Sequence, residues 1–314
     1  MSDSTPRRIL LIRLSSIGDI VLTTPLLHLL REKFPSCQID YVTKSRFKTL
    51  ICHHPAISHV LEFPDDGNWR GLRKMRRAIR AQKYDIVLDL HKNLRSFLLT
   101  LFQPIDKIYR LKKYGVRRFL LVKTGLNFYR TIQPVYRRYL DVARALGIGD
   151  EAQWSAVHVP AEVVSAVRKQ RFDQKTNFER LIVLAPGAGF ATKRWPVEKF
   201  SELAGHILAR GDACCLVGDQ NDRALAKTIA NAHPKCVDLT GQLSLLETAA
   251  VLSLARKVVC NDSGVMHIAE AVGTPVVAIF GSTVRELGFF PQRPDSRVIE
   301  NTDIRCRPCS HIGR

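Results

Sequence analysis

The fold is decided by residues 257–281, which read KVVCNDSGVMHIAEAVGTPVVAIFG. The short apolar, β-branched run at 258–259 predicts a buried strand, and the polar turn at 261–264 ends it. The apolar spacing at 265–272 predicts a helix, which a glycine and a proline terminate, and 276–280 predicts a second buried strand. A strand, turn, helix and strand in this order form a βαβ crossover. Its turn lies at the carboxyl edge of a parallel sheet.

Ligands of open α/β sheets bind at that edge, so the turn is a candidate site. Asp262 and Ser263 of the turn allow two interpretations. In the first, they only cap the helix that follows. In the second, the turn and the N–H groups of the helix's first turn hold an anion.

Length and composition indicate a globular protein of one large or two ordinary domains. The chain has 314 residues, of which 46% are hydrophobic and 25% charged. No window approaches the roughly 18 unbroken apolar residues of a membrane span. The N-terminus lacks the apolar region and cleavage site of a signal peptide, so we expect a cytoplasmic protein. Its eight cysteines lie scattered, which favours reduced thiols over a disulfide framework.

The positive charge is concentrated in the first half of the chain. The net charge is +19, and residues 1–155 carry 28 Lys and Arg against 13 Asp and Glu. The excess gathers at 70–83 and 107–118. Such a surface favours binding of a polyanion. The candidates are nucleic acid, anionic lipid headgroups and a phosphorylated substrate. The alternative is an ordinary solvated helix face.

The first half alternates predicted strands with predicted helices. We predict strands at residues 8–14, 38–42, 59–63, 84–90 and 108–111, and helices at 20–34, 44–52, 70–82 and 134–146. The loop at 15–19 after the first strand contains one glycine, Gly18, and therefore lacks the dinucleotide-binding pattern. A carboxylate in this loop would repel a phosphate, so Asp19 is better suited to accept a proton. The alternative is that Asp19 caps the following helix.

A second polar group follows the strand at 84–90. His91 is a candidate general acid or base, or a phosphate ligand, and Arg95 is a candidate anion clamp. Because both follow a strand of the same sheet, we expect them at the same edge as Asp19. Each of them, taken alone, is more often structural.

The second half repeats the strand–loop–helix pattern, and we place the domain boundary between residues 155 and 156. We predict helices at 161–172, 195–210 and 245–254, strands at 181–185 and 213–217, and a short strand and turn at 237–242.

The loop after the strand at 181–185 is rich in glycine and contains Gly187, Thr192 and Lys193. A ligand can approach such a backbone closely, so the loop is a candidate diphosphate clamp, although its spacing differs from that of a Walker loop. After the strand at 213–217, the carboxylate of Asp219 or Asp222 is a candidate contact for ribose hydroxyls.

With these motifs in view, the chain resembles glycosyltransferase family 9, the ADP-heptose–lipopolysaccharide heptosyltransferases of Gram-negative bacteria. The resembling motifs run in family order along nearly the whole chain: residues 14–19 (LSSIGD) with 23–25 (TTP), 84–91 (YDIVLDLH) with 95–96 (RS), 186–188 (PGA) with 193–196 (KRWP), 238–241 (DLTG), and 261–264 (NDSG) with His267.

The resemblance implies a GT-B fold, in which two Rossmann-like, doubly wound domains face each other across a cleft. Residues 1–155 would bind the acceptor and residues 156–314 the nucleotide-sugar. The implied reaction is an inverting transfer of heptose from ADP-heptose to the inner core of lipopolysaccharide, an acceptor of the lipid A–Kdo type. It implies Asp19 as catalytic base, Lys193 at the donor diphosphate and Asp262 at the sugar. Because protein groups stabilise the leaving diphosphate, neither a metal nor another cofactor is expected.

Besides the base Asp19, the candidate site residues form a donor-binding set and an acceptor-binding set. The donor-binding candidates are Gly187, Thr192, Lys193, Asp219, Asp222, Thr240, Gly241, Asp262, Ser263, Gly264 and His267. The acceptor-binding candidates are Ser16, Gly18, His91 and Arg95. Peripheral contact with the cytoplasmic face of the inner membrane is a further expectation.

Two alternatives compete with this interpretation. One keeps the GT-B fold but uses a different nucleotide-sugar or a surface-polysaccharide acceptor. The other is a nucleic-acid-binding protein that uses the basic half. The chain lacks a recognition-helix or base-stacking signature, so we expect no nucleic-acid partner.

The chain end departs from the family pattern. The family usually continues beyond a segment like 306–309 (CRPC), often with a final helix that packs on the first domain, whereas this sequence stops at Arg314. Cys306, Cys309 and His311 are a weak metal-site pattern, because a lone cysteine pair is not specific.

Overall fold

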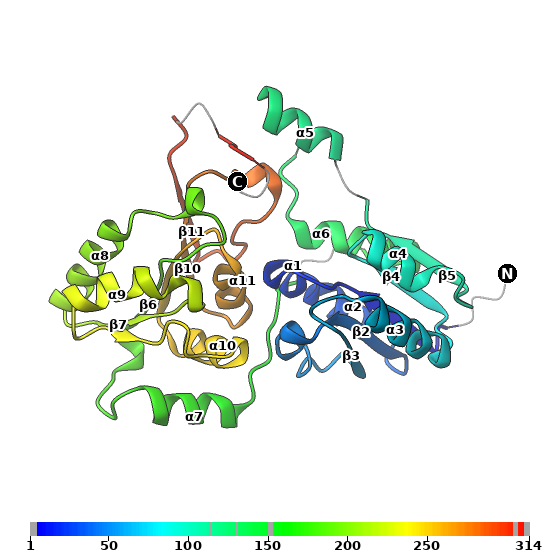
Figure 1. Cartoon of the computed structure of the whole chain (residues 1–314), viewed down its shortest axis with the longest axis horizontal. Coiled ribbons are helices and arrows are strands. Elements are labelled where there is room, and N and C mark those ends of the chain that lie inside the picture. Colours follow the sequence, from blue (N-terminus) through cyan, green and yellow to red (C-terminus); the bar gives the residue numbers. More distant parts are fainter. Residues whose placement is uncertain (1–4, 113–114, 130, 150–152, 304–306, 311–314) are drawn as a thin grey trace. The chain divides into compact units, whose positions relative to one another are not determined.

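The computed structural model describes the chain except for residues 1–4, 113–114, 130, 150–152, 304–306 and 311–314 (Figure 1). It divides into two compact units by its contacts, Met1–Lys113 with Val135–His158, and Tyr114–Pro134 with Val159–Arg314. This division differs from the boundary expected after residue 155, because the segment at 114–134 groups with the second unit. One bond within that grouping joins the Asn127 amide to the Glu286 carboxylate at 3.1 Å.

The first unit contains a parallel sheet of five strands in the order β3-β2-β1-β4-β5. The strands are β1 (Arg8–Ile12), β2 (Gln38–Lys44), β3 (His59–Phe63), β4 (Ile86–Asp89) and β5 (Lys107–Arg110). Leu10 of β1 pairs with Asp40 on one side and Val87 on the other. The chain order reverses between β1 and β4, and such a switch point opens a crevice at the carboxyl ends of the two strands.

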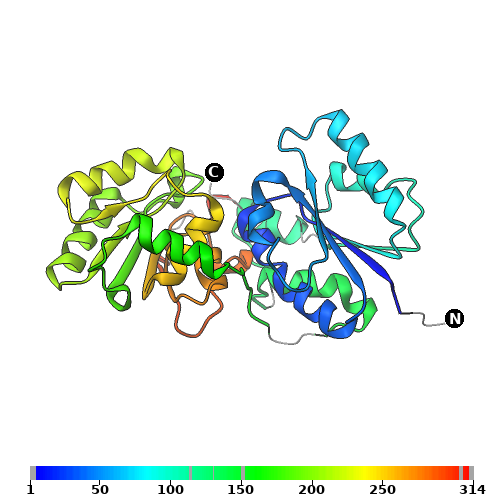
Figure 2. The ribbon, with the colours of Figure 1, turned by 90° about the horizontal axis from the view of Figure 1, so that it is seen from below.

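Helices cover both faces of this sheet. They are α1 (Ile17–Val21), α2 (Thr24–Lys33), the 3₁₀ helix η1 (Ser45–Leu50), α3 (Trp69–Gln82), α4 (Leu94–Thr100), α6 (Val135–Leu140) and the 3₁₀ helix η2 (Asp141–Leu146). Figure 2 shows the cyan α3 on one side of the blue strands and the dark blue α2 on the other. The core under α3 and α4 joins Leu72, Met75 and Leu99 of these helices to Leu10 and Val87 of the sheet.

Three helix predictions in the first unit were wrong in detail. The helix predicted at 20–34 is two helices, because Pro25 has no N–H to bond to the Val21 carbonyl. The Thr24 hydroxyl donates to that carbonyl instead, at 2.7 Å. The helix predicted at 44–52 is the 3₁₀ helix η1, and the one at 134–146 divides into α6 and η2.

The second unit contains a parallel sheet of six strands in the order β11-β10-β9-β6-β7-β8. These strands are β6 (Leu181–Ala185), β7 (Ala213–Leu216), β8 (Val237–Asp238), β9 (Lys257–Asn261), β10 (Val276–Phe280) and β11 (Arg297–Glu300). The crossover predicted at 257–281 is confirmed as β9, α11 (Gly264–Ala271) and β10, and Val258 pairs with Val276. The sequence interpretation did not include β11.

The helices of the second unit are α5 (Gly115–Thr124), α7 (Ala161–Arg171), α8 (Val197–Ala209), α9 (Arg223–Ala232) and α10 (Leu245–Leu254), with the 3₁₀ helices η3 (Phe178–Arg180), η4 (Ala191–Lys193), η5 (Gln220–Asp222) and η6 (Arg285–Leu287). Phe200 of α8 is fully buried against β6 and β7. Its ring meets the Trp195 ring edge to face, with centroids 5.0 Å apart.

The described part of the chain contains no helix that is long and apolar enough to span a membrane. The seven cysteines within it are free thiols, and Cys306 lies outside the described residues.

Phe200→Ala is expected to lower the free energy of unfolding by about 3–5 kcal/mol, because it leaves a cavity beneath the second sheet. Urea unfolding followed by tryptophan fluorescence measures this loss, since Trp195 contacts the ring. Phe119→Ala is the control, because Phe119 is 61% exposed and its truncation should change stability by less than about 0.5 kcal/mol. Equal losses in the two variants would contradict the packing described above.

Candidate active site

Asp19 is held by four hydrogen-bonding contacts where β1 leads into α1. Its Oδ1 lies 2.6 Å from Arg13 Nη2 and accepts from the Tyr139 hydroxyl at 2.8 Å. Its Oδ2 accepts from the Ser16 hydroxyl at 2.8 Å and from the Ser16 N–H at 3.2 Å. The Asp19 side chain is 15% exposed. The Asp19 carboxylate is therefore largely enclosed but not fully buried.

These contacts keep Asp19 ionised. Burial by itself would raise the pKa of this carboxyl, but the Arg13 charge and the hydrogen bonds from Tyr139 and Ser16 together lower it below its usual value. Burial, followed by the charge of Asp19, raises the pKa of Tyr139 well above its usual range, so the phenol remains a donor. A deprotonated carboxylate is the form that accepts a proton from a hydroxyl.

Arg13 connects the ends of the two central strands. Its Nε donates to the Ser15 carbonyl at 2.8 Å and its Nη1 donates to the Leu90 carbonyl, just beyond β4, at 2.6 Å. Its guanidinium also lies over the Tyr139 ring, 5.5 Å from the centroid. The sequence interpretation missed both Arg13 and Tyr139. An arginine within an apolar strand was a usable signal for Arg13, whereas nothing near Tyr139 in the sequence relates it to Asp19.

The structure bears on two expectations about the first loop. The turn expected at 15–19 is partly helical, because α1 begins at Ile17 and includes Gly18 and Asp19. Ser16 is the N-cap, and Asp19 takes part in capping as the third residue of the helix, where its side chain accepts from the Ser16 N–H. Gly18 is buried in the first turn of α1, and the side chain of Ser16 is bonded to Asp19.

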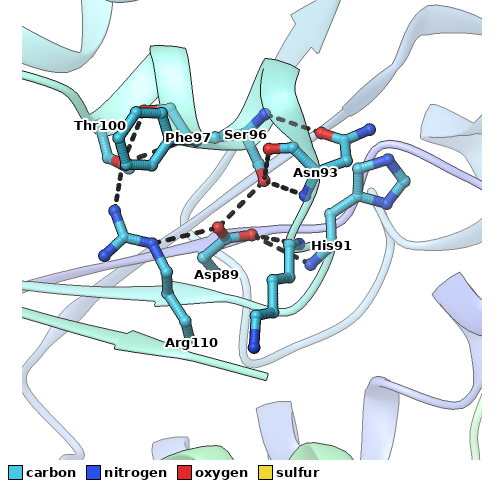
Figure 3. Close-up of polar contacts among 8 residues, drawn as sticks. Asp89, His91, Asn93, Ser96, Phe97, Thr100 and Arg110 are labelled. Atoms are coloured by element: carbon cyan, nitrogen blue, oxygen red, sulfur yellow. Dashed lines mark hydrogen bonds and ion pairs between the residues drawn. The ribbon is translucent and has the colours of Figure 1, made fainter. Parts of the chain in front are cut away.

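A buried carboxylate, Asp89, shapes the loop that carries His91. Its Oδ1 accepts from the N–H groups of His91 at 3.1 Å and Lys92 at 2.8 Å, and its Oδ2 accepts from the Ser96 hydroxyl at 3.0 Å (Figure 3). Arg110 lies 3.6 Å from the same Oδ2. Asp89 is fully buried, and Lys92 has a left-handed φ of +46°. Asp89 therefore fixes the backbone of the loop from its buried side, while the Lys92 side chain remains exposed.

The structure places Arg95 on α4, close to this loop. Its side chain is exposed and packs over Gly67, where a Cβ would come within 3.0 Å of the guanidinium carbon. Because Arg13 bonds to the carbonyl just before His91, the loop of Asp19 and the loop of His91 adjoin at the same sheet edge, as predicted.

In the second unit, Lys193 and Asp262 are in direct contact. Lys193 Nζ donates to Asp262 Oδ2 at 2.7 Å, and the Thr283 hydroxyl donates to the same oxygen at 2.7 Å. The two ion-paired side chains are 16% and 8% exposed. Lysine has three N–H donors, so two remain for other acceptors beside the bond to Asp262.

The fully buried Asn261 joins the glycine-rich loop to the end of β9. Its Nδ2 donates to the Pro186 carbonyl at 2.8 Å, and its Oδ1 accepts from the Trp195 N–H at 2.9 Å. Gly281 lies against the same loop, because a Cβ there would come within 2.9 Å of the Thr192 carbonyl oxygen. The sequence interpretation treated Asn261 only as part of a turn. The signal available in the sequence was the carboxamide of Asn261, which can both donate and accept hydrogen bonds.

Ser263, Gly264 and His267 belong to the start of α11. Ser263 is the N-cap, but its side chain makes no capping bond, and its buried Oγ has no hydrogen-bond partner among the residues described. Gly264 begins the helix. His267 is buried, with its ring edge-on to the Phe289 ring at 6.1 Å between centroids.

The two candidate ribose carboxylates occupy different environments. Asp222 is buried, which raises the pKa of its carboxyl, and it lies where a Cβ on Gly187 would collide at 2.1 Å. Asp219 is exposed and caps η5 through the Asn221 N–H at 2.7 Å. Asp222 therefore supports the glycine-rich loop, whereas Asp219 remains accessible to a ligand.

Thr240 and Gly241 follow β8 and approach the end of β7. The Gly241 N–H donates to the Gly218 carbonyl at 2.9 Å, and Gly241 has a left-handed φ of +69°, which favours glycine. Thr240 is 1% exposed, and its Oγ has no hydrogen-bond partner within the described part of the chain.

The described residues contain no group of three or more His, Cys, Asp or Glu side chains arranged to hold a metal ion. Of the weak cysteine pattern, Cys309 is exposed, whereas Cys306 and His311 lie outside the described residues.

The chain is similar to known proteins over most of its length. The model of glycosyltransferase family 9 (heptosyltransferase) matches residues 72–314. Lipooligosaccharide heptosyltransferase 2 of Haemophilus influenzae is 29% identical over 319 residues, which cover 95% of this chain and 91% of the relative.

Two solved structures share the fold. The family 9 glycosyl transferase of Veillonella parvula has a TM-score of 0.79 and 24% identity, with 95% of this chain and 86% of that chain covered. The ADP-heptose lps heptosyltransferase II of E. coli has a TM-score of 0.77 and 23% identity, with 96% and 95% covered. The predicted GT-B fold class, with two parallel α/β domains, is thereby confirmed. The chain belongs to glycosyltransferase family 9 and is a glycosyltransferase.

Proposed function

We propose that the protein transfers heptose from ADP-heptose to the inner core of lipopolysaccharide, with inversion at the anomeric carbon. The observation that carries this proposal is the Asp19 carboxylate held by Arg13 and Tyr139 in a chain of the heptosyltransferase family. The relative from Haemophilus influenzae is a lipooligosaccharide heptosyltransferase, and the E. coli neighbour is an ADP-heptose lps heptosyltransferase. Both names support heptose as the transferred sugar.

Asp19 acts as the general base in this proposal. The acceptor hydroxyl gives its proton to Asp19 as its oxygen bonds to the anomeric carbon of the donor. The bond from that carbon to the diphosphate oxygen breaks, and ADP leaves with the electron pair. Arg13 and Tyr139 are positioning residues, because they bind Oδ1, whereas Oδ2 has only Ser16 as its partner among the described residues.

The residues of the second unit bind the donor in this proposal. Lys193 uses the N–H groups not bonded to Asp262 for the diphosphate, assisted by the N–H groups at the start of α11 and by the Ser263 hydroxyl. Asp262 accepts from sugar hydroxyls, and Asp219 is the more accessible carboxylate for ribose.

The remaining members of the donor set shape the pocket in this proposal. The backbones of Gly187 and Gly241 permit close approach, and Thr192, Thr240 and Gly264 supply polar groups near the strand ends. Asp222 supports the loop from beneath. His267 of α11 packs against Phe289 and so supports the start of this helix.

The first unit binds the acceptor in this proposal. His91 and Arg95 contact its phosphate or carboxylate groups, while Ser16 and Gly18 border the base. We assign acceptor binding to residues 1–155 and donor binding to residues 156–314. Because the acceptor is lipid-linked, the enzyme works in the cytoplasm with peripheral contact at the cytoplasmic face of the inner membrane.

Asp19→Asn is expected to lower the rate of transfer by about 10²–10⁴-fold, because the amide does not accept the proton, while ADP binding stays unchanged. Transfer is measured with ADP-heptose and a lipid A–Kdo acceptor, and ADP binding by calorimetry. Asp65→Asn is the control, since Asp65 is an exposed carboxylate beside Arg46. Loss of ADP affinity in Asp19→Asn would argue against a base.

Tyr139→Phe is expected to move the acidic limb of the kcat/KM pH profile to higher pH. The Tyr139 hydrogen bond helps to lower the pKa of Asp19, so its loss raises that pKa, and the base becomes protonated at a higher pH. Tyr84→Phe is a matched control, because this buried tyrosine donates to the carboxylate of Asp40 at 2.6 Å. An unshifted limb, or a shift to lower pH, would contradict the role of Tyr139.

Lys193→Ala is expected to weaken ADP binding about ten- to hundredfold, the effect of losing a hydrogen bond between charged groups. The rise in melting temperature on adding ADP reports this, since only a ligand of the native state stabilises it. Lys199→Ala is the control, because Lys199 is exposed and pairs with Glu202 in α8. UDP and GDP are tested beside ADP. A larger shift with UDP would favour a different nucleotide-sugar.

A further inference from the structure

The outer face of α3 is strongly cationic. The helix contains six Arg and Lys residues and no acidic residue. Leu72, Met75 and Ile79 face the sheet and are buried. Five of the basic side chains are exposed: Arg70, Arg73, Lys74, Arg77 and Arg80. None of these five makes an ion pair with another described residue. The positive charge therefore faces outward rather than being neutralised within the unit.

Large apolar side chains accompany these cations. Trp69, the first residue of α3, is 58% exposed, and the Arg73 guanidinium lies 5.5 Å from its ring centroid. Leu94 of α4 is 72% exposed, Phe97 is 45% exposed, and Phe102, just beyond α4, is 85% exposed. Apolar side chains that gather in an exposed patch rimmed by polar residues mark an interaction site.

The two sets belong to one surface, because α3 and α4 lie side by side. The Arg76 guanidinium donates to the Leu98 and Leu101 carbonyls at the end of α4, at 2.8 Å for Leu101. At the other end, Arg95 of α4 packs over Gly67, just before α3. Both helices bury apolar residues in the same core cluster. Their outer sides therefore form one face, which we name the α3–α4 face.

We propose that the α3–α4 face docks on a bilayer that contains anionic lipid, with the cations at the headgroups and Trp69, Leu94 and Phe102 in the interface. Cations near an anionic membrane and amphipathic side chains at its boundary are the two components of peripheral binding. The proposal deepens the proposed function and rests on it, because it names the surface that meets a lipid-linked acceptor. Arg95 and the loop of His91 adjoin this face, so docking would bring headgroup-level sugars to the acceptor site.

The combination of side chains favours lipid over nucleic acid. A nucleic-acid surface uses cations with aromatic rings that stack on bases. Leu94, an aliphatic residue, is among the most exposed large side chains of the face, and it has no role against a phosphate backbone or a base. Aliphatic and aromatic side chains beside a cationic helix are typical of surfaces that bind in the headgroup region of a membrane.

The test is sedimentation of the whole protein with vesicles of phosphatidylethanolamine and phosphatidylglycerol, compared with vesicles of phosphatidylcholine. We expect binding only to the anionic vesicles, weakened at high salt. Each cation near such a surface contributes about a fivefold factor, so Arg73→Glu, Lys74→Glu and Arg77→Glu together should lower the partition coefficient by at least about 100-fold.

The matched control reverses three exposed cations of the second unit, Lys169→Glu, Lys227→Glu and Lys235→Glu, which changes the net charge equally. This control should bind vesicles like the parent protein. Equal losses in the two triple variants, or equal binding to phosphatidylcholine, would overturn the proposal. Binding to a short RNA duplex that falls in the α3 variant while vesicle binding persists would also overturn it.

Apolar contact is tested separately with Leu94→Ser and Phe102→Asn, which should weaken vesicle binding several-fold while its salt dependence persists. Unchanged binding would contradict insertion at the interface. Transfer to a water-soluble, deacylated acceptor distinguishes failure of this inference from failure of the proposed function. The α3 variants should retain that transfer, whereas an inactive parent protein would refute the proposed function alone.

Discussion

The buried contact between Arg13 and Asp19 organises the active edge of the first unit. At 2.6 Å it joins the end of β1 to α1, and Arg13 continues to the carbonyl of Leu90 beyond β4. Tyr139 completes the group from α6. Removing one member of such a buried pair leaves an uncompensated charge, which costs about 3–5 kcal/mol. The same contact therefore stabilises the switch point of the sheet and holds the carboxylate ionised, so structure and proposed chemistry depend on one interaction.

The second unit uses the same plan with different groups. A strand ends, a short polar turn follows, and a helix begins, and here the joining residue is the neutral Asn261. Its carboxamide binds the backbone of the glycine-rich loop, and the neighbouring Asp262 holds Lys193. A neutral amide suits this position, because a charge there would be fully buried without a partner. The lysine is thus held at the strand ends, and one of its three N–H donors is bonded within the described part of the chain.

The positive charge of the first unit is used in two ways. Arg13 and Arg76 bind carboxylate or carbonyl oxygens inside the unit, where they join elements together. The cations on the outer side of α3 do not add to the packing, since they are exposed and the helix carries no acid. Packing explains why Arg13 and Arg76 are charged. It does not explain the exposed cations of α3, so a partner outside the chain is the better explanation for them.

The sequence by itself determined the two parallel α/β units, the crossover at 257–281 and the candidates at the strand ends, including Asp19, Lys193 and Asp262. These features depend on local spacing of apolar residues and on turns, which short stretches of sequence carry. Tertiary structure alone decided that Tyr139 meets Asp19 across 120 residues and that Asn261 meets Pro186 across 75. It also decided that the segment at 114–134 groups with the second unit. Such pairings arise where the sheet brings distant strand ends together, and no local pattern encodes them.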